Sequence, residues 1–173
     1  MTAAAREPIA FESIYKERVW GGRALETAFG RRLPVAERPY GEAWEVVDRP
    51  DDRCRVAGGV HAGRTLHDLW TEHRTEIFGP GYEDAGPDFP LLVKILDARR
   101  NLSIQVHPPA EAAAKLGGEP KTEMWVVADA EPGTRVDAGT GLGVGDDPHL
   151  GLGLAAELRG SFGRRMDLDR EIP

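Results

Sequence analysis

A short segment in the second half of the chain, residues 102–107 (LSIQVH), alternates polar and apolar side chains as a β-strand does. Gln105 and His107 are two positions apart, so a strand places both side chains on one face. Glu123 opens a second apolar run, and a neighbouring antiparallel strand would bring its carboxylate opposite that pair. The pattern therefore favours a β fold in which three polar groups converge.

These three groups are an amide, an imidazole and a carboxylate, with no thiolate among them. Such a set suits zinc, or a similar divalent ion, acting as a Lewis acid. Taken from the residues alone, a hydrogen-bonded polar cluster without metal remains the alternative interpretation, because one histidine with an amide and a carboxylate is a small ligand set.

Five separated segments of the chain resemble the signature of the type I mannose-6-phosphate isomerases, a family of zinc enzymes with a cupin fold. The five agree with the family in order and at about its spacing, and the resemblance covers roughly residues 6–136. They are residues 17–22 (ERVWGG), 41–46 (GEAWEV), 90–98 (PLLVKILDA), 102–108 (LSIQVHP) and 121–125 (KTEMW).

The resemblance implies a mainly β fold, a cupin-like jelly roll (double-stranded β-helix) with short flanking helices. It also implies that Gln105, His107 and Glu123 bind one zinc ion. Lys94 and Lys121 would line a sugar-phosphate pocket, and Lys121 is the candidate for proton transfer. The implied reaction interconverts mannose 6-phosphate and fructose 6-phosphate.

The last part of the chain departs from the family pattern. The family's fourth zinc ligand, a histidine in a Pro-x-Gly-x-x-His segment, and a pocket arginine are both expected beyond Pro173. Residues 1–137 are therefore interpreted as the N-terminal part of the isomerase domain, and residues 138–173 as a glycine-rich, divergent or partly disordered segment. Within this region, residues 135–160 are expected to be loop or disordered, because they are rich in glycine and show little periodicity.

An incomplete domain leaves two further hypotheses open. The chain is either a non-catalytic cupin remnant that binds metal or sugar, or one half of a split isomerase that needs a complementing C-terminal half. Unpaired strand edges in such a domain favour self-association. His149 is a possible substitute for the fourth ligand, although a glycine-rich loop would hold it poorly in place.

Residues 91–96 (LLVKIL) are apolar apart from Lys94, which predicts a buried strand that carries one charge. The alternative places Lys94 at the edge of a sheet, with its ammonium group in water. Short helices are predicted at residues 23–29, 66–73 and 110–116, and the second of these is capped by Thr65 with Asp68 at the third helical position.

The other histidines, His61, His67 and His73, are six residues apart, which matches neither a strand face nor a helix face. They are interpreted as surface or partly buried residues unrelated to metal.

The formal net charge of −7 argues against nucleic acid or an anionic membrane as a partner. The one cysteine, Cys54, permits no disulfide within the chain, and no segment resembles a signal peptide or approaches the length of a membrane helix. A cytoplasmic protein with a sugar-phosphate substrate is the expectation.

Overall fold

The structure is a computed structural model that describes residues 7–102, 110–117, 121–131 and 152–159. Within these residues the chain is mainly β, with one five-stranded sheet, one two-stranded sheet and four short helices. The expectation of a mainly β fold with short flanking helices is confirmed. The segment that carries Gln105 and His107 lies outside the described residues.

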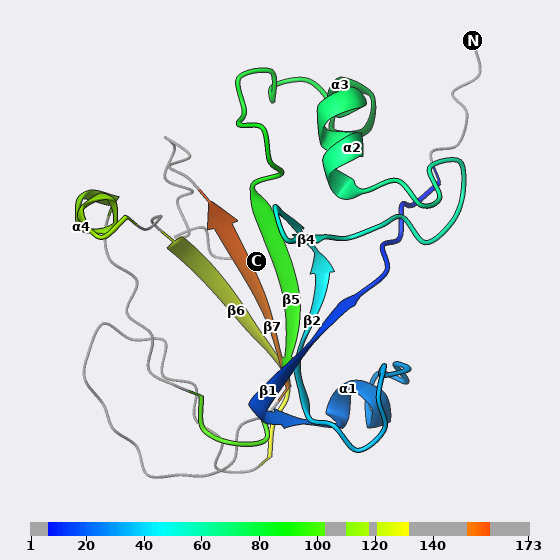
Figure 1. The fold of residues 1–173 in the computed structure, drawn as a ribbon, viewed down its shortest axis with the longest axis vertical. Coiled ribbons are helices and arrows are strands. Elements are labelled where there is room, and N and C mark those ends of the chain that lie inside the picture. The colour runs from blue at the N-terminus through cyan, green and yellow to red at the C-terminus, as the bar shows by residue number, and fades with distance from the viewer. Residues whose placement is uncertain (1–6, 103–109, 118–120, 132–151, 160–173) are drawn as a thin grey trace, which may run out of the picture.

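The larger sheet is antiparallel throughout and has the strand order β1-β2-β5-β7-β6 (Figure 1). Its strands are β1 (Ile14–Gly22), β2 (Tyr40–Val46), β5 (Leu91–Asp97), β6 (Lys121–Asp129) and β7 (Leu152–Arg159). The strand predicted at residues 91–96 and the strand opened by Glu123 are both confirmed.

Strand β7 corrects the interpretation of residues 135–160 as loop or disorder, because residues 152–159 pair with both β5 and β6. Its position also places β5 in the middle of the sheet, between β2 and β7. Lys94 therefore lies in a central strand and not at the edge of the sheet, and it is half-buried.

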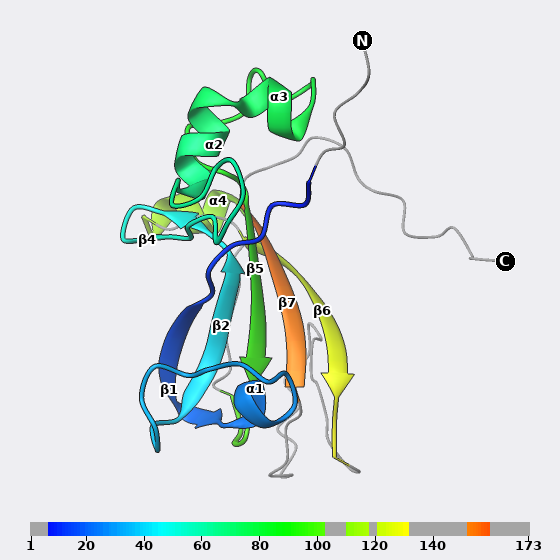
Figure 2. The same ribbon diagram turned by 90° about the vertical axis from the view of Figure 1, so that its right-hand side faces the viewer.

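Helices lie on different sides of the sheet. Helix α1 (Ala24–Thr27) faces the viewer in Figure 2, whereas α4 (Ala110–Lys115) lies behind the sheet. Helices α2 (Leu66–Glu72) and α3 (Arg74–Phe78) sit beyond one end of the strands, near the two-stranded sheet. The predicted helices α1, α2 and α4 are confirmed with shorter bounds, and α3 is an additional helix.

The two-stranded sheet is a tight hairpin that follows β2 almost immediately. It consists of β3 (Asp48–Arg49) and β4 (Asp52–Arg53). Its first residue, Asp48, is thereby placed beneath α2.

The start of α2 follows the predicted capping signal. The Thr65 hydroxyl accepts the Asp68 backbone N–H at 3.1 Å, and the Asp68 carboxylate accepts the Thr65 backbone N–H at 2.8 Å. This reciprocal capping box satisfies two backbone donors that would otherwise have no partner in the first turn.

Two apolar clusters form the core. In the first, Leu25 of α1 and Leu33 pack on Ala43 of β2, with Tyr15 and Ile95 against them. This cluster covers one face of the sheet.

The second cluster lies beneath α2 and α3 and contains Val47, Cys54, Leu66 and Leu92. Trp70 is fully buried beside it and makes edge-on contacts with the rings of Phe78, Tyr82 and Phe89. The aromatic cluster thus joins the two helices to the connection that precedes β5.

Asp97, at the end of β5, joins the sheet to α1. Its Oδ2 accepts the backbone N–H groups of Ala24 at 2.5 Å and Leu25 at 3.4 Å. The side chain is buried, and burial raises the pKa of its carboxyl group, although the two backbone donors act in the opposite direction. Asp97 therefore serves as the N-terminal cap of α1 at some cost in desolvation.

Glycines allow β1 and β2 to cross closely. A Cβ atom at Gly21 would lie 2.4 Å from the Gly41 nitrogen, and one at Gly41 would lie 2.6 Å from the Arg18 Cβ. No larger residue fits at either position without a backbone shift. No helix in the described ranges is both long and apolar enough to cross a membrane.

Candidate active site

The structure places three of the five predicted site residues on the same sheet. Lys94 is in the middle of β5, and Lys121 and Glu123 lie on β6. Gln105 and His107 belong to residues 103–109, outside the described part of the chain. The relation between these two and the other three therefore stays a prediction.

The pairing register shows which residues share a face of the sheet. Lys94 pairs with Trp44 on β2 and with Ala155 on β7, and Ala155 pairs in turn with Trp125 on β6. Directly paired residues of antiparallel strands point to the same side. Lys94 and the two tryptophans therefore form one row across the sheet.

Glu123 precedes Trp125 by two positions, so it lies on the same face as Lys94. Lys121 occupies the next position of that face along β6. Ala43, Tyr15 and Ile95 occupy the opposite face, under α1. The predicted residues that the structure describes are thus brought to one side of the sheet, the side on which α4 lies (Figure 2).

On β6, the indole Nε1 of Trp125 donates a hydrogen bond to Glu123 Oε2 at 3.1 Å. Both side chains are half-buried. A donor to one carboxylate oxygen restricts the rotation of the whole carboxylate group. Trp125 therefore fixes how Glu123 is presented.

The same arrangement recurs on β2, where Trp44 Nε1 donates to Glu42 Oε2 at 2.6 Å. Glu42 is buried and also accepts hydrogen bonds from Arg18, at 3.0 Å to Oε1 and 3.4 Å to Oε2. The Lys16 ammonium lies 4.6 Å from the centre of the Trp44 ring and 2.5 Å from Asp52 Oδ1. Each cation on the β2 side of the row is thus paired with a carboxylate, Lys16 with Asp52 and Arg18 with Glu42.

Sequence reasoning missed the two tryptophans and Glu42 as parts of this face. The signal was present, because Glu-x-Trp occurs twice, at residues 42–44 and 123–125, and a spacing of two in a strand places both side chains on one side. In the pairing register, Ala155 of β7 lies between Lys94 and Trp125, and Glu157 of the same strand pairs with Glu123.

This arrangement combines a fixed carboxylate with cationic groups. A carboxylate is a ligand for a divalent cation, and compact ammonium groups suit phosphate. The described part of this face thus offers a carboxylate, Glu123, and an ammonium group, Lys94, as charged groups.

Comparison with known proteins identifies the family of this chain. The family model of the phosphomannose isomerase type I catalytic domain matches residues 9–124, a range that contains all five predicted site residues. Mannose-6-phosphate isomerase ManA of Bacillus subtilis is 41% identical over 130 residues, which are 72% of this chain and 38% of ManA. The Bacillus subtilis protein named "Probable mannose-6-phosphate isomerase GmuF" is 38% identical over 162 residues, 92% of this chain and 45% of GmuF. The chain thus spans less than half the length of these relatives.

Solved structures show the same fold. The crystal structure of mannose 6-phosphate isomerase from Bacillus subtilis superposes with a TM-score of 0.68 at 28% identity, covering 88% of this chain and 59% of that one. A zinc-bound mannose 6-phosphate isomerase gives a TM-score of 0.60 at 22% identity, covering 70% and 36%. With the family match over residues 9–124, this likeness shows that the chain belongs to the type I phosphomannose isomerase family, with its cupin-like fold.

Proposed function

We propose that this chain forms part of the active site of a zinc-dependent isomerase that interconverts mannose 6-phosphate and fructose 6-phosphate. The observation that carries the proposal is the shared face of the sheet, on which Lys94 lies in a row with Trp44 and Trp125, and Glu123 lies two residues before Trp125 on β6. The names of the relatives support the choice of substrate.

In this proposal, Gln105, His107 and Glu123 hold the metal. The residues fit a zinc ion by their chemistry, because an amide oxygen, an imidazole and a carboxylate are borderline-hard donors. Glu123 also accepts a hydrogen bond from the indole N–H of Trp125 at 3.1 Å. Carboxylates that bind metal commonly have such a hydrogen-bond donor, which orients them. When bound, the ion would supply a Lewis acid that stabilises negative charge on the sugar's carbonyl oxygen.

The isomerisation moves a proton between C2 and C1 of the sugar, so it needs a group that accepts and returns that proton. Lys121 is the proposed proton carrier. Its position on β6 is two residues from Glu123, and an ammonium group beside a divalent cation loses its proton more easily. Lys94, in the central strand, is the proposed cation for the phosphate group.

The experiment is a coupled assay of mannose 6-phosphate isomerisation with added zinc. Because the chain spans 38% of ManA, the assay is run on the chain alone and on the chain mixed with the C-terminal part of ManA. We expect zinc-dependent turnover in the mixture. Lys121→Ala should lower it by about 100-fold or more, the usual contribution of a proton-transfer group.

Lys115→Ala is the matched control, because Lys115 is exposed on the last turn of α4. Turnover should be nearly unchanged in this variant. Binding of mannose 6-phosphate with no turnover in either sample would contradict the isomerase proposal and favour a binding role. Equal losses in the two lysine variants would remove Lys121 as the proton carrier.

A further inference from the structure

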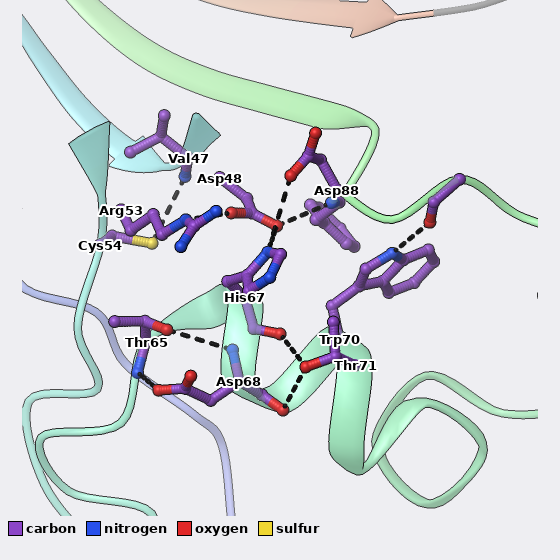
Figure 3. Close-up of polar contacts among 12 residues, drawn as sticks. Val47, Asp48, Arg53, Cys54, Thr65, His67, Asp68, Trp70, Thr71 and Asp88 are labelled. Atoms are coloured by element: carbon purple, nitrogen blue, oxygen red, sulfur yellow. Dashed lines mark hydrogen bonds and ion pairs between the residues drawn. The ribbon is translucent and has the colours of Figure 1, made fainter. Parts of the chain in front are cut away.

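A second group of polar side chains lies beneath α2, on elements that do not include Glu123 or Lys94. Asp48 begins β3, His67 is in the first turn of α2, and Asp88 lies in the connection between α3 and β5 (Figure 3). One ligand atom from each lies within 4.8 Å of the other two. Three segments far apart in the sequence therefore meet at one point.

The two distances from His67 are close to those between the ligands of a metal site. His67 Nδ1 is 3.1 Å from Asp48 Oδ2 and 3.6 Å from Asp88 Oδ1. In a tetrahedral site with metal–ligand bonds of about 2.0–2.1 Å, neighbouring ligand atoms are separated by about 3.4 Å. The two measured separations lie on either side of that value.

Hydrogen bonds do not account for the contact between His67 and Asp88. A ring nitrogen carries one proton at most, and the contact to Asp88 at 3.6 Å is too long for a hydrogen bond. An ion between the three atoms would contact all of them at once.

Asp48 gives a second, independent observation. Its side chain is fully buried, and its Oδ1 receives no hydrogen bond from the described residues, only an ion-pair contact from Arg53 Nε at 3.2 Å. Its other oxygen, Oδ2, faces the group, where it accepts the Phe89 backbone N–H at 2.9 Å and lies 3.1 Å from His67 Nδ1. Burying a carboxylate is costly unless charge compensates it; Arg53 offers one positive charge to Asp48, and a bound cation would add a second at its other oxygen.

Asp88 keeps the site open to solvent, since about a third of its side chain is exposed. An ion can therefore enter from that side, and water can complete its coordination. One imidazole with two carboxylates suits zinc or another borderline divalent ion.

We infer that Asp48, His67 and Asp88 form a second divalent-cation site, a structural clamp independent of the proposed catalytic metal. The clamp would tie the hairpin of β3 and β4, the first turn of α2 and the start of β5 together over the cluster of Val47, Cys54, Leu66 and Leu92. This assigns to His67 a role that sequence reasoning did not give it, although its predicted partial burial is confirmed.

The test uses the His107→Ala protein, which lacks one ligand of the proposed catalytic site. Zinc is removed with a chelator, Zn²⁺ alone is titrated back, and both bound zinc and the melting temperature are measured. We expect the His107→Ala chain to bind one zinc ion and to gain melting temperature as it does so. Adding Asp88→Asn should weaken that binding at least about tenfold and abolish the gain.

Asp84→Asn is the matched control, because Asp84 is an exposed carboxylate in the same connection. Its titration should match that of His107→Ala alone. The comparison uses only the change in melting temperature on adding zinc. A direct effect of Asp88→Asn on the stability of the zinc-free protein therefore does not alter the conclusion. Unchanged zinc binding in the Asp88→Asn double variant, or none in His107→Ala itself, would overturn the inference.

This experiment distinguishes failure of the catalytic-site proposal from failure of the clamp proposal. Equal zinc content in the parent chain and in His107→Ala would count against the catalytic site alone. Loss of the second ion on Asp88→Asn would still support the clamp.

Discussion

The indole N–H of Trp125 lies 3.1 Å from Oε2 of Glu123, two residues earlier on the same strand. On β2, Trp44 and Glu42 repeat the arrangement at 2.6 Å. In both strands, a tryptophan two positions after a glutamate thus donates to its carboxylate, and on β2 Arg18 of the neighbouring strand donates to it as well.

Replacing Trp125 with phenylalanine keeps an aromatic ring and removes the N–H donor to Glu123. If Glu123 is a zinc ligand, we expect zinc affinity to fall about tenfold, the lower end of the effect of losing an outer hydrogen bond. The measurement is a competitive zinc titration, with the melting temperature of the zinc-free protein recorded beside it. A purely structural tryptophan would lower the melting temperature and leave the affinity alone.

Trp44→Phe is the control for this prediction. It removes the corresponding donor from Glu42, which Arg18 still holds through two contacts. Zinc affinity should be unchanged in this variant. A similar loss of affinity in both would contradict a specific role for Trp125.

Asp97→Asn tests the electrostatics of the α1 cap. The folded pKa of Asp97 is raised, chiefly by burial, above its unfolded value near 3.8, so the folded protein binds this proton more tightly. The contribution of Asp97 to the free energy of unfolding therefore rises as pH falls from the raised folded pKa to the unfolded one, and it is lowest at neutral pH.

The Asn variant lacks this dependence, because its amide does not titrate. Urea unfolding of both proteins at about pH 7 and about pH 4 measures the effect. We expect the free energy of unfolding of the variant, relative to that of the parent, to be higher at the higher pH than at the lower pH. Any effect of the amide on the α1 cap that does not depend on pH cancels in this comparison. A relative gain at the lower pH would show that the backbone donors, not burial, dominate the pKa.

The sequence predicted those elements whose signal lies within a few neighbouring residues. The capping box of Thr65 and Asp68 marked the start of α2, and the apolar run around Lys94 marked β5. In both cases the deciding interactions lie within a few residues along the chain.

Strand β7 was not predicted because its alternation of apolar and polar residues is incomplete. Leu152, Leu154 and Leu158 alternate with Gly153 and other small or polar residues, yet glycine weakens a strand and marks loops. Pairing with β5 on one side and β6 on the other supplies what the segment's own propensity lacks.

The cluster of Asp48, His67 and Asp88 had no signal in the sequence at all. Its members are 19 and 21 positions apart, and only the packing of α2 against the hairpin and the start of β5 unites them. By contrast, the family resemblance implied that Lys94 and Glu123 belong to one site, and the strand register places them on one face of the sheet.

The central claim is that Glu123, with Gln105 and His107, holds a zinc ion on the face of the sheet that carries Lys94. Its most direct test is the zinc content of the Asp88→Asn chain after dialysis, with and without Glu123→Ala. Asp88→Asn removes the contribution of the proposed clamp, so any remaining zinc reports on the catalytic site. The account predicts about one zinc ion per chain in the single variant and a loss of most of it in the double variant. Equal zinc content in the two proteins would contradict the claim.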